Sequence, residues 1–430
     1  MRIESILNQT TEHKGFVYGQ ARWVEEEEEE EEEKDEGDEK PPRRLEISVR
    51  ARKGSRGVCS GCGKKAPGYD RQAPRRFEFI PFWGILVFFV YAMRRVDCPR
   101  CGIKVERVPW AEGKSPITTR YAWFLAGWAK RLSWSGVAKV FHTSWYHVAC
   151  AVEQAVEWGR QHMVLEGITA IGVDELAWQK GHRYVTVVYQ INDGCKRLLW
   201  VGQHRCVKPL LKFFRWLGEE RSAAIEYVCS DMWKPYLKVI AKKIPQAIHV
   251  LDRFHIMAHL SKAIDEVRAG EAREMKRKGL EPLLSHSRWC LLKRVSHLTT
   301  KQATKLEDLL QYNLKTIKVY LMKEEFQLFW TYVSPSWAGR FLDAWCTRAM
   351  RSRIEPIKGV ARMLRNHREL ILNWFRAKKE YSSGVIEGLN NKAKLSTRMA
   401  YGYGSFKTLE IVLYHRLGDL PEPKFTHRFF

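Results

Sequence analysis

The chain has 430 residues, 45% of them hydrophobic, which is enough for several modules with buried cores. Its net charge is +24, yet thirteen of its 49 acidic residues lie between Glu25 and Glu39. The rest of the chain therefore carries 72 basic against 36 acidic residues, an excess that favours a polyanionic partner, most simply nucleic acid. No apolar run reaches the roughly 18–20 residues that cross a bilayer. The nearest, Ile80 to Met93, contains Pro81 and Gly84 and is interpreted as a buried β segment.

The N-terminus lacks the apolar core of a signal peptide. We therefore expect a protein of a reducing compartment, with no membrane association, in which the ten cysteines remain thiols or bind metal.

Residues 1–110 are predicted to form a β hairpin and a zinc ribbon. Two strand-like pieces, residues 14–24 and 43–52, flank the polyglutamate segment 25–39. Like charges repel, so this segment is expected to be a solvated loop at the hairpin tip; a DNA-mimicking, autoinhibitory role is the alternative. Two CxxC pairs follow, each with a glycine after it, and four thiolates at this spacing are typical of structural Zn²⁺. The predicted ligands are Cys59, Cys62, Cys98 and Cys101.

Residues 115–162 have helical periodicity. Serines near positions 133 and 144 precede two amphipathic stretches, an order that predicts a helix-turn-helix DNA-binding domain. Trp145, Tyr146 and His147 would then begin the recognition helix and contact DNA bases.

From residue 166 the period changes to that of strands. Three strands, a helix, and then alternating strands and helices predict an α/β, ribonuclease H-like catalytic domain, formed by residues 166–257 and 380–418. Residues 258–379 have only helical patterns and are predicted to be a helical insertion.

Two of these strands are followed by an aspartate, Asp174 and Asp231. If the first and fourth strands are neighbours, the two carboxylates face each other and repel unless a cation such as Mg²⁺ lies between them. Two ions about 3.5–4 Å apart need a third ligand, and we assign that role to Glu387. On a helix, Glu387 shares one stripe with Asn391, Lys394 and Arg398, which would contact DNA phosphates.

Asp252 ends the next strand, in the sequence DRFH with His255. It is interpreted either as support for the metal ligands, together with His255, or as the N-cap of the following helix.

The motifs CSGC, RRVDCPRC, IGVDELAW, YVCSDMWKPY, LDRFHI and SSGVIEGLNNKAK occur in the order of the DDE transposases of bacterial insertion sequences, and the chain most resembles their ISL3 family. The resemblance begins near Gly15 and spans nearly the whole chain; the polyglutamate segment departs from the family pattern. It implies that Asp174, Asp231 and Glu387 are the catalytic triad, with two Mg²⁺ ions or Mn²⁺ as cofactor.

The expected function is that of a transposase, an enzyme that binds the terminal inverted repeats of its element, cleaves them and joins them to target DNA. The expected assembly on the two ends is a homodimer, in the bacterial cytoplasm and held at the nucleoid by DNA. The alternatives are an inactive DNA-binding regulator derived from a transposase and a structure-specific nuclease of the same fold.

Overall fold

The computed structural model describes residues 3–10, 13–24, 42–179, 181, 183–381, 384–400 and 402–426. The chain divides into two compact units, Met1–Met163 with Lys407–Phe430 and Val164–Phe406. The polyglutamate prediction for residues 25–39 lies outside the described residues. The boundaries predicted for the individual domains stay predictions.

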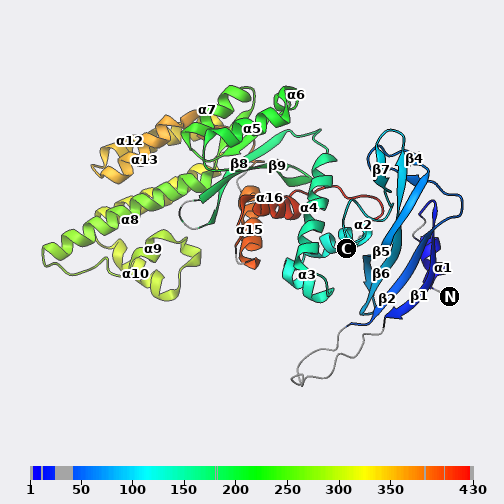
Figure 1. Ribbon diagram of the computed structural model, residues 1–430. Coiled ribbons are helices and arrows are strands. Elements are labelled where there is room, and N and C mark those ends of the chain that lie inside the picture. Colours follow the sequence, from blue (N-terminus) through cyan, green and yellow to red (C-terminus); the bar gives the residue numbers. More distant parts are fainter. Residues whose placement is uncertain are drawn as a thin grey trace, which may run out of the picture. The chain divides into compact units, whose positions relative to one another are not determined.

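The first unit contains a five-stranded sheet in the order β1-β2-β6-β5, with β7 paired to β6 (Figure 1). Its elements are α1 Ile3–Thr10, β1 Phe16–Val24, β2 Arg44–Ala51, β3 Gly57–Val58, β4 Lys65–Ala66, β5 Gly68–Phe82, β6 Ile85–Cys98 and β7 Gly102–Val105. β1 and β2 pair antiparallel, which confirms the two predicted strands. The run from Ile80 to Met93 forms no single strand. It bends at Trp83 and Gly84, the turn between β5 and β6.

The core of this sheet is aromatic. The Trp110 ring is 2% exposed and meets Phe16, Phe77 and Tyr91 edge-on, at ring-centroid distances of 4.8, 6.0 and 5.3 Å. Aromatic pairs prefer this geometry and bury a large apolar area. The cluster therefore packs the segment around Trp110, which follows β7, against the sheet.

The first unit also contains a group of helices: α2 Thr119–Ala129, α3 Trp134–Val140, α4 Trp145–Gln161 and α16 Phe406–Leu417. Ser133 and Ser144 cap α3 and α4 by accepting hydrogen bonds from the backbone N–H groups of Gly136 and His147. The predicted break between two helices is therefore confirmed. α16 is tied to α4 by an ion pair between Arg160 and Glu410 at 3.2 Å.

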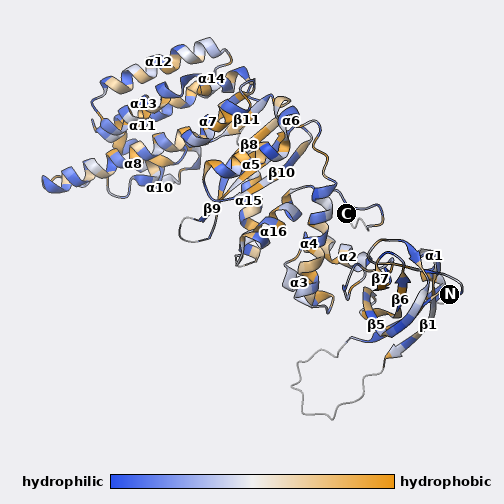
Figure 2. Ribbon diagram, turned by 45° about the horizontal axis from the view of Figure 1, so that its top comes forward, coloured by the Kyte–Doolittle hydropathy of each residue, from blue (hydrophilic) through white to orange (hydrophobic). Residues whose placement is uncertain are grey.

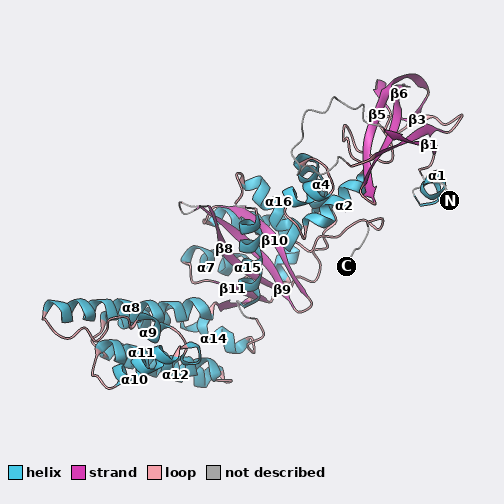
Figure 3. Cartoon of the chain, turned by 90° about the horizontal axis from the view of Figure 1, so that it is seen from below, coloured by secondary structure: helices cyan, strands magenta, loops and turns pink. Residues whose placement is uncertain are grey.

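The second unit contains a five-stranded sheet in the order β10-β9-β8-β11-β12. Figure 3 labels β8, β9, β10 and β11 in this sheet. The strands are β8 Ala170–Gln179, β9 Arg183–Asn192, β10 Cys195–Gln203, β11 Tyr227–Ser230 and β12 Ile248–Leu251; the helices beside them are α5 Val207–Leu217, α6 Glu219–Ala223 and α7 Lys234–Lys243. β8, β9 and β10 are antiparallel neighbours, whereas β11 is parallel to both β8 and β12. The first and fourth strands are adjacent, as the sequence analysis required.

Different helices cover the two faces of this sheet. Side chains alternate along each strand, so two residues that are three positions apart point to opposite faces. Thr186 on β9 contacts the Tyr236 hydroxyl of α7 at 2.8 Å. Tyr189, three residues on, donates to Asn390 of α15 Gly384–Met399. The strands are correspondingly rich in hydrophobic residues (Figure 2).

Between β12 and α15 the chain is helical, as predicted. Its elements are α8 Arg253–Arg277, α9 Arg288–Leu292, η1 Val295–His297, α10 Thr300–Leu310, α11 Lys315–Gln327, η2 Leu328–Thr331, α12 Pro335–Arg351, α13 Glu355–Asn366 and α14 Arg368–Arg376. Trp345, Phe326 and Phe329 are fully buried at its centre. None of the helices within the described part of the chain is long and apolar enough to cross a membrane.

Candidate active site

Asp174 and Asp231 lie at the same end of the second sheet, where the parallel pairing of β8 with β11 stops. β8 and β11 run parallel, and their last paired residues are Val173 and Ser230. The two aspartates follow that pair directly, one on each strand. The prediction that Asp174 stands just past its strand is wrong in detail, because β8 continues to Gln179 through its pairing with β9. Only the pairing with β11 ends there.

Asp252 follows Leu251, which pairs with Ser230 on the far side of β11. Three aspartates therefore directly follow the last residues through which three neighbouring strands, β8, β11 and β12, pair in parallel. The Asp252 carboxylate accepts a hydrogen bond from the backbone N–H of Phe254 at 2.7 Å, which confirms its interpretation as an N-cap. His255 lies with its Nε2 3.7 Å from the Asp252 carboxylate.

Asn390 joins α15 to the sheet. Its side-chain amide donates to Asp174 Oδ2 at 2.5 Å, and its oxygen accepts from the Tyr189 hydroxyl at 2.7 Å. The side chain is buried, so both hydrogen bonds are shielded from water. Sequence reasoning chose Asn391 and missed Asn390. Asn390 could have been identified from the sequence, because it is a polar residue on the apolar face of the helix, together with Ile386 and Ala393.

The approach of α15 to β8 is close because position 172 is glycine. A Cβ atom at Gly172 would lie 2.5 Å from Ile386 Cδ1. Ile386 is itself 3% exposed. Gly172 therefore provides the space in which the helix that carries Asn390 and Glu387 rests on the sheet.

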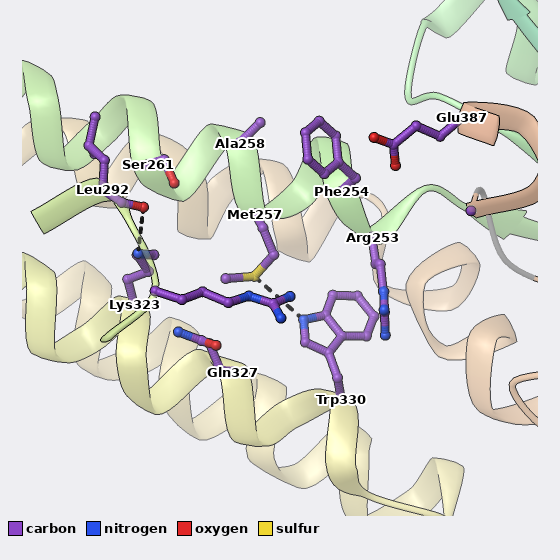
Figure 4. Close-up of a pocket in the computed structure, with 12 residues that line it drawn as sticks. Arg253, Phe254, Met257, Ala258, Ser261, Leu292, Lys323, Gln327, Trp330 and Glu387 are labelled. Atoms are coloured by element: carbon purple, nitrogen blue, oxygen red, sulfur yellow. Dashed lines mark hydrogen bonds between the residues drawn. The ribbon is translucent and has the colours of Figure 1, made fainter. Parts of the chain in front are cut away.

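Glu387 lies one helical turn before Asn390 and is exposed. Its carboxylate extends from α15 toward the Phe254 ring at the start of α8 (Figure 4). The rest of the predicted stripe, Asn391, Lys394 and Arg398, is exposed too, whereas Leu389 and Ala393, which lie off the stripe, are buried.

Burial and repulsion between acidic residues raise the pKa values of two carboxyl groups in this part of the sheet. Burial is the main cause that raises the pKa of Asp174, and the charge of Asp231 adds to it. Burial raises the pKa of Glu175 to about 7, against the opposing effect of Arg205 and with further repulsion from Asp231 and Asp174. Neighbouring carboxylates repel unless a proton or a cation lies between them.

Arg205 supplies part of the compensating charge. Its guanidinium lies 2.6 Å from Glu175 and 3.7 Å from Asp231 and stacks over the Trp233 ring at 5.1 Å. Glu175 Oε1 nevertheless remains buried without a hydrogen-bond partner among the described residues. Sequence reasoning missed both Glu175 and Arg205.

An oxygen-only set of ligands fits a hard divalent cation such as Mg²⁺ or Mn²⁺. The structure places Asp174 and Asp231 side by side through the pairing of β8 with β11, whereas the Glu175 side chain leaves β8 on the opposite side. It does not gather Asp174, Asp231 and Glu387 as tightly as the four cysteines. In the described part of the chain, Cys59, Cys62, Cys98 and Cys101 are the one group of three or more potential metal ligands with all ligand atoms within 4.8 Å.

The four cysteines come from two similar turns. Cys59 and Cys62 lie between β3 and β4, whereas Cys98 is the last residue of β6 and Cys101 directly precedes β7. The glycine after each pair has positive φ, 71° at Gly63 and 68° at Gly102, which lets the backbone fold back around the sulfurs. The four thiols are compatible with a structural zinc site.

The residues predicted to contact DNA at the start of α4 differ in accessibility. Trp145 and Tyr146 are 51% and 68% exposed. His147 turns toward β5, with its Nδ1 3.0 Å from Thr143 Oγ1 and 3.3 Å from the Glu78 carboxylate.

Comparison with known proteins gives consistent results. The model of the ISL3 family of DDE transposases, described as "Transposase", matches residues 171–413. The transposase for insertion sequence element IS1001 of Bordetella parapertussis is 29% identical over 368 residues, which cover 85% of this chain and 89% of that protein. The transposase for insertion sequence element IS1557 of Mycobacterium tuberculosis is 30% identical over 394 residues, which cover 85% of this chain and 87% of that protein.

Proposed function

Because this chain belongs to the ISL3 family of DDE transposases, we propose that it binds the terminal inverted repeats of its own element, cleaves the DNA there and joins the ends to target DNA. The observation that carries this proposal is the placement of Asp174 beside Asp231, with α15 tied to Asp174 through Asn390. The strand order β10-β9-β8-β11-β12, with β11 and β12 parallel to β8, supports a ribonuclease H-like catalytic domain.

Asp174, Asp231 and Glu387 would hold Mg²⁺ or Mn²⁺, as one or two ions, which when bound lower the pKa of an attacking water or 3′-hydroxyl and stabilise the leaving oxygen. Asn390 keeps the Asp174 carboxylate in one orientation. Arg205 holds Glu175 and faces Asp231, so it limits the repulsion between the acids before DNA arrives. His255 would support this site through its contact with Asp252.

The remaining predicted parts of the protein would bind DNA. The exposed stripe of Asn391, Lys394 and Arg398 begins one turn from Glu387 and has the charge to contact phosphates. α3 and α4 have the order of a helix-turn-helix, with Trp145 and Tyr146 exposed at the start of the second helix. Zn²⁺ on the four cysteines would stabilise the fold next to β6 and β7. Two ends must be held together, so we expect a homodimer on DNA.

The test is the variant Glu387→Gln, which keeps the shape of the side chain and removes its charge. Cleavage of a labelled element end in Mg²⁺ should fall by several orders of magnitude, because a lost transition-state metal interaction costs several kcal/mol. Binding to the same end should hardly change. Glu307→Gln, an exposed acid on α10, is the matched control and should cleave like the unaltered protein.

Asp174→Asn and Asp231→Asn should behave like Glu387→Gln, and double variants should be little worse than single ones, because the residues act as a unit. Normal cleavage by Glu387→Gln would remove this residue from the active site. End binding without any cleavage by the unaltered protein would favour an inactive regulator. Cleavage that ignores the sequence of the end would favour a structure-specific nuclease.

A further inference from the structure

A cavity of about 780 Å³ opens beside Glu387, between the start of α8 and the segment α11–η2. Figure 4 shows Arg253 and Phe254 entering it from α8, Lys323, Gln327 and Trp330 from the opposite side, and Glu387 at one end. Its volume lies within the roughly 300–1,000 Å³ typical of pockets that enclose a small organic ligand. It is therefore large enough for one nucleotide and too small for stacked base pairs.

The cavity lining combines aromatic and cationic side chains. Phe254 has a ring that is 61% exposed, and the Trp330 side chain donates through Nε1 to Met257 Sδ at 3.5 Å, which fixes the indole at the cavity wall. Aromatic faces of this kind stack on nucleic-acid bases regardless of sequence.

The charged lining residues are cationic except for Glu387. They are Arg253, Arg294 and Lys323. The Lys323 ammonium is buried, and its hydrogen bonds to the carbonyls of Leu291 and Leu292 are long, 3.4 and 3.5 Å, with the Glu324 carboxylate 3.4 Å away. Glu324 is therefore the anionic partner of the buried Lys323, and the exposed side chains of Arg253 and Arg294 are the cations of the lining that a phosphate can reach.

From this arrangement we infer that the cavity binds one unpaired nucleotide of the DNA end, with its base against Phe254 and Trp330 and its phosphate toward the cations. This inference rests on the proposed function, because that function brings the phosphodiester to Glu387, at the rim of the same cavity. A base that remains paired and stacked cannot enter, so the nucleotide must leave the helix beside the cleavage position.

The experiment is a double-mutant cycle in which one change is made in the protein and the other in the DNA. Affinity is measured for element-end duplexes in which the nucleotides around the cleavage position are made abasic one at a time, using protein with Glu387→Gln so that no cutting interferes. On the intact end, the further substitution Phe254→Ala should weaken binding by about tenfold. On the end that lacks the base in question, the same substitution should have no effect.

The matched control is Trp337→Ala on α12. Trp337 is 59% exposed and outside the cavity lining, so its substitution should show no coupling to any DNA position. A 5-iodouracil at the coupled position should also crosslink to Phe254 or Trp330 in protein whose only change is Glu387→Gln, a readout that does not depend on how stable a variant is.

Coupling of Phe254→Ala to one or two adjacent positions, with the crosslink at the same position, supports the inference. Additive effects at every position overturn it, and so does a crosslink only to residues outside the cavity. Its failure is separate from failure of the proposed function. Normal cleavage by the unaltered protein with no coupling rejects the cavity alone, whereas absence of cleavage by the unaltered protein rejects the catalytic proposal.

Discussion

The substitution Gly172→Ala tests how α15 is held on the sheet without changing any acid. The new Cβ atom would lie 2.5 Å from Ile386 Cδ1 and 2.6 Å from Cγ1. Carbon atoms in contact are normally about 3.5–4.0 Å apart, so Ile386 or the whole helix must move by about 1 Å or more. Because Ile386 is buried, we expect much of that shift to pass to the helix.

Overpacking of this kind typically costs about 1–3 kcal/mol of unfolding free energy. The functional cost should be larger than the stability loss suggests. Asn390 and Glu387 move with the helix, and a displacement of about 1 Å at a catalytic group can slow a reaction about 100-fold. Cleavage of a labelled element end and denaturant unfolding measure the two effects separately.

A second substitution makes the reasoning refutable. Ile386→Ala creates a cavity when made alone, but in combination with Gly172→Ala it removes the clash, so the double variant should cleave faster than the sum of the single effects predicts. Gly359→Ala in α13 is the control, because nothing lies within 4 Å of its new Cβ atom. Normal cleavage and normal stability of Gly172→Ala would refute the close packing described above.

Three further predictions concern other parts of the molecule. Purified protein should contain one Zn²⁺ per chain, and freshly purified protein without zinc would contradict this. Cys62→Ser should abolish zinc binding and make the first unit sensitive to proteolysis, while the second unit stays folded. Replacing residues 25–39 by a short Gly-Asn turn should leave folding and cleavage intact and raise DNA affinity modestly at low salt, whereas a large activation at all salt concentrations would indicate autoinhibition. Burial lowers the pKa of His249 to about 4, below its unfolded value near 6.5, so the unfolded chain binds more protons between these pH values. Unfolding free energy should therefore fall as the pH drops from 6.5 to 4, and in His249→Gln it should fall less; parallel curves for both proteins would exclude this residue as a cause.

The parts of the fold that the sequence predicted are those set by local patterns. Ser133 and Ser144 are helix caps because they precede amphipathic stretches. The hydrophobic runs before Asp231 and Asp252 are strands, because a continuous apolar run that is too short for a helix is typical of a strand buried on both faces. The neighbour relation of β8 and β11 was also within reach, since an order of three antiparallel strands followed by crossover helices leaves few topologies.

What the sequence could not predict depends on contacts between distant segments. Glu175 and Asp174 are neighbours whose side chains leave opposite sides of β8, and nothing near Glu175 in the sequence indicates that Arg205 will reach it. The parallel pairing of β2 with β6 is equally nonlocal. The turn at Trp83 divides a run that looked continuous, because the apolar residues on either side belong to two strands of the same hairpin.

The distance along the chain between Asp231 and Glu387 is no obstacle to their acting at one site, because the helical segment between them is anchored to the sheet at both ends. Asp252 caps α8 at the edge where Asp174 and Asp231 lie. At the other end, Asn373 of α14 donates to the backbone carbonyl of His249 in β12 at 2.8 Å, so the chain returns to the sheet before α15 begins. Asn390 and Ile386 then fix α15 against β8. Each of these contacts lies within the second unit, and together they set where Glu387 can be, whatever the intervening helices bind.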